Sequence, residues 1–154
     1  MARGLVSVLA AGLTLTGCAV GRPLGFAGRT DSFCGDALTT ISKLAPPATL
    51  EDKMRFATDR YTAIERTVSE LTDSSLPGGA SGQQLRERWL RPARGSLQAG
   101  RAVLDQLRTA IQGHDTPAAD RAFARSLSIG TDGVDDGLLR QRGLMTCATL
   151  FAPG

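Results

Sequence analysis

A stripe of apolar residues at helical spacing is the feature that most constrains the fold of this 154-residue chain. Between residues 50 and 71 the apolar positions recur four and three residues apart: Leu50, Met54, Ala57, Tyr61, Ile64, Val68 and Leu71. An α-helix brings such positions onto one face, and that face must be buried against another element. Thr49 and Asp52 resemble a capping box, which predicts that the helix begins directly after Thr49.

A second apolar stripe of the same spacing contains Leu90, Ala93, Leu97, Gly100, Leu104, Leu107 and Ile111. The glycine-rich segment 74–82 separates the two stripes, so we expect a flexible connection there and a helix from about Gln83. Pro92 lies inside this helix and removes one backbone hydrogen bond. The sequence therefore predicts a kink near Trp89, or a break into two helices.

The two stripes together predict an antiparallel helical hairpin with a definite register. One flank of the first stripe carries Glu51, Thr58, Glu65 and Thr72, and one flank of the second carries Arg94, Arg101 and Arg108. One register opposes Glu51 to Arg108, Thr58 to Arg101 and Glu65 to Arg94, so that every arginine faces a glutamate or a threonine. We expect this register, although each exposed ion pair contributes only about 0.2–1 kcal/mol.

Shorter signals predict further helices on either side of the hairpin. Asp31 or Ser32 is expected to cap a first helix that ends at about Leu44, before the prolines at 46 and 47. Thr116 as the cap and Pro117 as the first helical residue predict another helix. Glycines at 130, 133 and 137 leave open whether residues 130–148 form one continuous helix. The whole pattern indicates an all-α fold, a small bundle of about four helices.

The composition limits the class of protein. The chain is 42% hydrophobic with a net charge of +3, which excludes a disordered chain and leaves room for one domain. No apolar stretch reaches the roughly 18 residues of a membrane-spanning helix. The basic residues are spread along the chain and nearly balanced by acids, so no nucleic-acid partner is expected.

The N-terminal sequence indicates an export signal. Arg3 gives a short positive region, and the apolar run from Leu5 to Leu15 has the length of a secretory signal. It ends in Leu15-Thr16-Gly17-Cys18, which resembles the lipobox of bacterial lipoproteins. This resemblance implies a signal peptide over residues 1–17, acylation of Cys18, a flexible tether over 18–30 and a bundle domain over 31–152. An ordinary signal peptide and an uncleaved anchor are the alternatives.

The lipoprotein resemblance also implies a location. Two or three acyl chains on Cys18, palmitate among them, hold a protein on the membrane. We therefore expect a protein anchored to the extracytoplasmic face of the cell membrane. The whole chain resembles small actinobacterial lipoproteins of uncharacterised role, and all but two of its 18 basic residues are arginine.

If Cys18 is acylated, Cys34 and Cys147 remain, and both lie in an oxidising compartment. We expect them to form a disulfide that joins the first and last helices and contributes roughly 4 to 5 kcal/mol in the chain-entropy model. Two free thiols are the alternative, and a metal site is expected less.

Few residues indicate catalysis. His114 is the one histidine and is expected in a solvated loop. The acidic residues Asp132, Asp135 and Asp136 lack the spacing of a calcium loop, so helix capping is the simpler interpretation. The glycines of 77–82 lack the lysine of a phosphate loop. We expect no enzyme, cofactor or metal, although Glu51, Glu65, Glu70 and Glu87 leave paired-carboxylate chemistry open.

Two binding hypotheses remain. The arginines at 94, 101 and 108 can meet an anionic lipid or cell-wall polymer, but pairing within the chain is the preferred interpretation. Tyr61 and Trp89 are candidates for lining a pocket. The preferred function is a non-catalytic interaction module of the cell envelope that binds an unknown protein or polymer. The alternative is a carrier that holds an apolar small molecule or lipid between helices.

Overall fold

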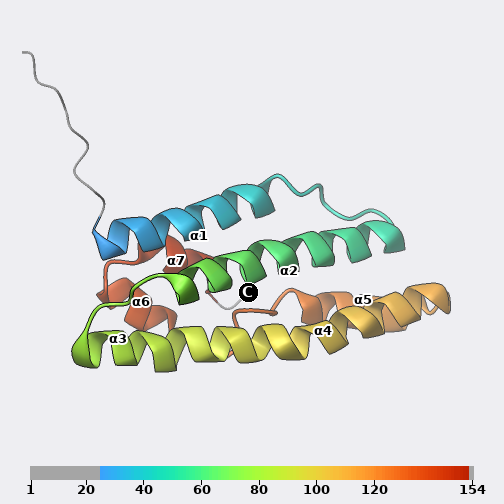
Figure 1. The fold of residues 1–154 in the computed structure, drawn as a ribbon. Helices are drawn as coiled ribbons and strands as arrows, with labels where there is room; N and C mark the ends of the chain where they lie inside the picture. The colour runs from blue at the N-terminus through green and yellow to red at the C-terminus, as the bar shows by residue number, and fades with distance from the viewer. Residues whose placement is uncertain (1–24, 153–154) are drawn as a thin grey trace, which may run out of the picture.

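The computed structural model describes residues 25–152, and every regular element in this part of the chain is helical. Figure 1 shows the bundle, which confirms the expected all-α fold. Its elements are α1 Phe26–Ser42, α2 Leu50–Asp73, α3 Gly79–Leu85, a π-helical turn η1 Arg86–Leu90, α4 Arg91–Gln112, α5 Thr116–Ser126, α6 Asp136–Gln141 and α7 Met145–Leu150. Because α3, η1 and α4 follow one another without a gap, they form one long segment.

Helix α2 confirms the prediction from the first apolar stripe. The Thr49 hydroxyl accepts a hydrogen bond from the Asp52 N–H, and the Asp52 carboxylate accepts one from the Thr49 N–H, both at 3.1 Å. These bonds complete the capping box and hold the pKa of Asp52 below its ordinary value. Every stripe residue from Ala57 to Leu71 is buried.

Helix α1 begins earlier than expected, at Phe26, so residues 26–30 are helical and do not belong to a flexible tether. Phe26 packs against the core and Thr30 is buried. The helical spacing of Phe26, Thr30, Phe33 and Ala37 extends the apolar face backwards through residues that the neighbouring glycines and proline had made look irregular. The expected cap at Asp31 is also wrong, because the Asp31 carboxylate binds α7.

The sequence predicted a kink near Trp89 or a break into two helices, but the long segment is unbroken and instead forms a π turn just before Pro92. The Arg91 N–H bonds to the Arg86 carbonyl, five residues back. Pro92 has no N–H for the Arg88 carbonyl, which instead accepts from the Asp135 N–H at 3.0 Å. The Arg88 guanidinium also donates to the Asp135 carboxylate. The π turn therefore leaves the segment continuous and fixes the chain just before α6.

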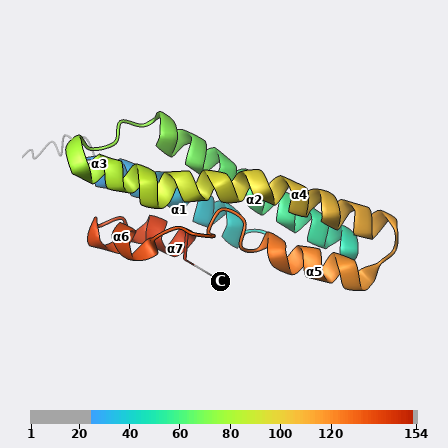
Figure 2. The same cartoon turned by 90° about the horizontal axis from the view of Figure 1, so that it is seen from below.

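The helices pack in two groups along the long segment. Figures 1 and 2 show α2 antiparallel to α4, with α1 beside α2 and α5 along the C-terminal half of α4. Helices α6 and α7 pack at the other end, near η1 and α1. There Trp89 is fully buried and meets Phe151 edge to face, with ring centroids 5.8 Å apart.

The connection between α5 and α6 packs against both α2 and α4. Gly130 has a φ of +88°, and a Cβ atom there would lie 2.6 Å from Cγ2 of Ile64. The Gly130 N–H donates to the Ser96 hydroxyl at 2.9 Å, and the Arg60 guanidinium donates to the Ile129 carbonyl at 3.2 Å. Burial lowers the pKa of Arg60. These contacts hold an irregular segment in the interior.

The end of the chain forms two short helices rather than one continuous helix over residues 130–148. A turn with Gly143 at a φ of +73° separates α6 from α7. The Asp135 carboxylate caps α6 by accepting from the Leu138 N–H at 2.8 Å, which confirms the capping interpretation for this residue. Helix α5 is capped in the same way by Asp115, not by Thr116 as expected.

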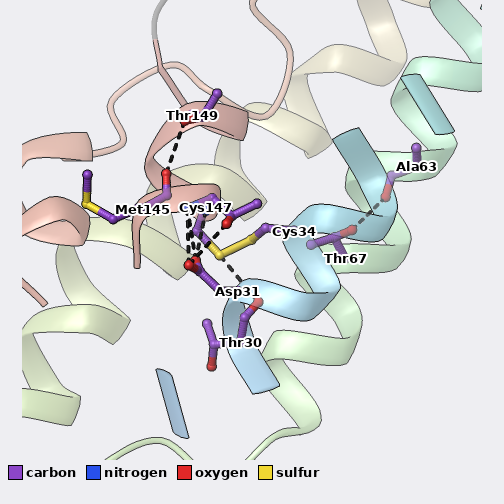
Figure 3. The surroundings of a disulfide bond; sticks show 9 residues. Thr30, Asp31, Cys34, Ala63, Thr67, Met145, Cys147 and Thr149 are labelled. Carbon is purple, nitrogen blue, oxygen red and sulfur yellow. Dashed lines mark hydrogen bonds between the residues drawn. A yellow bond between two sulfur atoms is a disulfide. The ribbon is translucent and has the colours of Figure 1, made fainter. Parts of the chain in front are cut away.

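Cys34 and Cys147 form the expected disulfide between α1 and α7. Figure 3 shows Asp31, on α1, pointing at the start of α7 beside this bond. Its carboxylate accepts from the N–H groups of Thr146 and Cys147, both at 3.1 Å, and from the Thr146 hydroxyl. A covalent bond and a charge-assisted cap therefore hold the two helices together.

Candidate functional site

A groove of about 610 Å³ lies between the end of α2 and the long helical segment. We call it the arginine groove; its walls are Thr72, Ser74, Ser75, Leu76, Arg86, Leu90, Arg91, Arg94, Gly95 and Gln98. Three of these residues are arginines and none is acidic. A concave surface with this lining concentrates positive potential and favours anions.

The π turn decides which arginines line the groove. In an uninterrupted α-helix, residue 90 would follow residue 86 on the same face. The Arg91 N–H to Arg86 carbonyl bond instead places Arg91 one turn after Arg86, while Leu90 is buried. Arg86 and Arg91 were not predicted as site residues, because residues five positions apart do not share a face in a regular α-helix. Pro92 was the available signal.

The register of the hairpin differs from the expected one by a heptad. Arg101 donates to the Glu65 carboxylate at 3.0 Å, so Glu65 faces Arg101 and not Arg94. Arg94 shares the groove wall with Thr72. The antiparallel arrangement is confirmed, but the expected pairing of Glu65 with Arg94 is wrong. A slide by one heptad keeps the same apolar faces in contact, and the exposed charges are too weak to prevent it.

Two arginines of the groove lack an acidic partner. Among the described residues, neither Arg86 nor Arg94 makes an ion pair or a side-chain hydrogen bond. Arg91 pairs with Glu87 at 3.2 Å across one turn, and both side chains are largely exposed. The Thr72 hydroxyl is buried and has no hydrogen-bond partner in the described part of the chain. The groove therefore offers unpaired donors.

This donor set is suited to binding an oxyanion. A guanidinium presents planar N–H groups that match the oxygens of a phosphate or carboxylate, often in pairs. Among the described residues that line the groove, the uncharged polar side chains are hydroxyls and one amide, and none is a histidine, a cysteine or a carboxylate. Its residues support binding of an anion more directly than chemistry on one.

The other two arginines of the predicted row pair within the chain. Arg101 donates through Nε to the Tyr61 hydroxyl at 3.1 Å as well as to Glu65, and Arg108 pairs with Asp105 on its own helix. The contacts of Tyr61 and Glu65 raise the pKa of Arg101. Burial raises the pKa of Tyr61. Only Arg94 of the predicted row is left to meet an external anion.

Tyr61 and Trp89 do not line a common pocket in the described part of the chain. Tyr61 lines a shallow cavity of about 320 Å³ beside the arginine groove, with Glu65, Arg94 and Arg101. Trp89 is 0% exposed, and its Nε1 has no hydrogen-bond partner in the described chain. The Trp89 ring is a core residue packed on Phe151, and it opens into none of these cavities.

The residues considered for catalysis lie apart. His114 is exposed in the turn between α4 and α5, with a φ of +54°. Glu65 and Glu87 each face an arginine, and Glu51 and Glu70 are exposed on α2. Asp132 accepts from the Ser128 hydroxyl, and Asp136 pairs with Arg140. Within residues 25–152, no three His, Cys, Asp or Glu side chains converge as metal ligands.

The N-terminal features lie outside the described residues. They comprise the signal peptide over 1–17, the lipobox and Cys18, together with residues 18–24 of the expected tether. In the part of the chain that the structure covers, no helix has both the length and the apolar character needed to cross a membrane.

No family model matches this chain, and neither the curated proteins nor the solved structures include one significantly similar to it.

Proposed function

We propose that this protein is a lipid-anchored lipoprotein on the extracytoplasmic face of a bacterial cell membrane, where it acts as a non-catalytic interaction module. The lipobox-like sequence Leu15-Thr16-Gly17-Cys18 supports the anchor. The observation that carries the location is the Cys34–Cys147 disulfide. Disulfides persist outside the reducing cytoplasm, and this one ties the two ends of the domain together.

The arginine groove supports the role of an interaction module. It is a preformed surface on which Arg86 and Arg94 make no ion pair with the described residues. The alternative role, a carrier for an apolar ligand between helices, has less support. Trp89, which was expected to line such a pocket, is enclosed by the core.

Mass spectrometry of the protein from its own membrane fraction tests the anchor. We expect an N-terminal peptide that begins at Cys18 and carries a diacylglyceryl group, and a Cys18→Ser variant that leaves the membrane fraction or retains its signal peptide. An unmodified Cys18 in the mature protein would overturn the anchor.

Crosslinking in the same membranes tests the module. A stoichiometric protein or polymer crosslinked to the domain supports the interaction role. A co-purified apolar metabolite without such a partner would favour the carrier.

A further inference from the structure

The arginine groove lies at the end of the bundle where the described chain begins. In Figures 1 and 2 the start of α1, the connection between α2 and α3, and α3 itself gather at this end, with α5 at the opposite one. Residues 74–76 of that connection form one wall of the groove. The groove and the N-terminal attachment point of the domain therefore share one end of the molecule.

Little chain separates this end from the proposed anchor. Gly25, the residue before α1, follows Cys18 by seven residues. An extended chain spans at most about 3.6 Å per residue, so the start of α1 lies within about 25 Å of an anchor at Cys18. The early start of α1 shortens this reach compared with a tether that runs to residue 30. An anchor at Cys18 would therefore keep this end of the bundle near the membrane surface.

We propose that the arginine groove binds the phosphate of an anionic phospholipid headgroup and so orients the anchored domain on the membrane. The orientation rests on the proposed lipid anchor, whereas headgroup binding is a property of the groove alone.

The contacts available in the groove fit a headgroup phosphate. Arg86 and Arg94 have no acidic partner in the described chain, so these two arginines can bind an anion without losing an existing ion pair. Arg91 adds a third cation, although Glu87 partly neutralises it. The side chains of Leu76 and Leu90 give the groove apolar wall beside these donors. A phosphate with an apolar glycerol ester attached has this same mixture of charge and apolar surface.

The charge distribution also favours a negatively charged lipid over a zwitterionic one. No acidic residue is among the lining residues of the groove, and Arg86 and Arg94 provide two positive charges without an ion-pair partner in the described chain, one more than a single phosphate charge. A choline group would bring its own cation beside these arginines, whereas a glycerol headgroup would not. We therefore expect discrimination between phosphatidylglycerol and phosphatidylcholine.

A titration of the full chain with short-chain, water-soluble lipids tests the proposal. The probes are dihexanoyl phosphatidylglycerol, dihexanoyl phosphatidylcholine and inorganic phosphate, each below any micelle-forming concentration. Binding is followed by calorimetry and by the NMR signals of the arginine Nε–H groups. We expect saturable binding of phosphatidylglycerol, and about fivefold weaker binding for Arg86→Gln and for Arg94→Gln.

Arg121→Gln is the matched control. Arg121 is an exposed arginine of α5 that makes no ion pair or side-chain hydrogen bond with the described residues, and it lies at the opposite end of the bundle. Its replacement removes the same charge and should leave the affinity unchanged. Far-UV circular dichroism is used to check that each variant remains folded.

Three outcomes would overturn the proposal. Equal loss of affinity in the Arg86, Arg94 and Arg121 variants, or no loss in any, would mean that the groove is not the site. Inorganic phosphate binding as tightly as phosphatidylglycerol would assign the groove to free phosphate instead of a lipid. Because these ligands are soluble, the result is independent of acylation at Cys18, and failure of the anchor would be seen separately in its mass spectrum.

Discussion

Replacing Gly100 with alanine tests how closely α4 packs on the connection between α5 and α6. A Cβ atom at residue 100 would lie 2.5 Å from Cγ2 of Ile129 and 3.0 Å from both its Cγ1 and Cδ1. Ile129 is itself buried, and close-packed interiors leave such a side chain little room to withdraw. Overpacking of this kind costs about 1–3 kcal/mol.

Gly95, on the same helix, is the matched control. A Cβ atom there meets nothing within 4 Å. Both substitutions gain about 1 kcal/mol of helix propensity, which cancels when the two variants are compared. We expect Gly95→Ala to raise the free energy of unfolding by about 1 kcal/mol, and Gly100→Ala to lie about 1–3 kcal/mol below Gly95→Ala.

Urea unfolding followed by far-UV circular dichroism, with the disulfide intact, measures these differences. In an Ile129→Ala background the three contacting atoms are absent, so Gly100→Ala should then stabilise the protein as Gly95→Ala does. This reversal separates a local clash from a general intolerance of change at residue 100. Equal stability of Gly95→Ala and Gly100→Ala in the unmodified chain would refute the reasoning.

Three further predictions concern the disulfide and the Asp31 hydrogen bonds that join α1 to α7, and the ionisation of Tyr61. Reducing Cys34–Cys147, which are 113 residues apart, should lower the free energy of unfolding by about 4–5 kcal/mol in urea titrations with and without reductant. Asp31→Ala removes the acceptor of two N–H groups at the start of α7 and should lower the free energy of unfolding by about 1–3 kcal/mol. Asp36→Ala, at an exposed site on α1, should change it little. Tyr61 is the one tyrosine, so its phenolate absorbance reports its pKa directly, and burial should place that pKa above its ordinary value near 10. Because the folded state disfavours ionisation of Tyr61, the stability that this shift contributes is complete below the pKa of the unfolded chain and is lost as pH rises through the pKa of the folded protein. Tyr61→Phe should abolish this loss of stability at alkaline pH. A phenolate titration with an unshifted pKa would contradict the prediction.

Local rules were sufficient where one segment decides its own structure. The apolar stripe of α2 and its capping box follow from neighbouring residues, and the structure confirms both. At Pro92 the local rule indicated an irregular turn, which the structure forms as a π turn without the expected break. The rules were wrong where a residue distant in sequence determines the contact that a side chain makes. Asp31 has the sequence context of a cap for its own helix, yet its carboxylate caps α7, more than a hundred residues away. No local pattern reports such a contact. The early start of α1 was missed for a different reason, because neighbouring glycines and a proline obscured the helical spacing of Phe26 and Thr30.

The incorrect register connects the fold to the candidate site. Charge pairing along the flanks favoured Glu65 opposite Arg94, but exposed ion pairs contribute too little to choose between registers one heptad apart. Burial of a large side chain contributes more, and Trp89 is fully buried against Phe151. In this register Arg101 pairs with Glu65, and Arg94 shares the groove wall with Thr72 and makes no ion pair with the described residues. The π turn before Pro92 then adds Arg86 and Arg91 to the same wall. The register and the π turn together therefore place the two unpaired arginines, Arg86 and Arg94, in one groove.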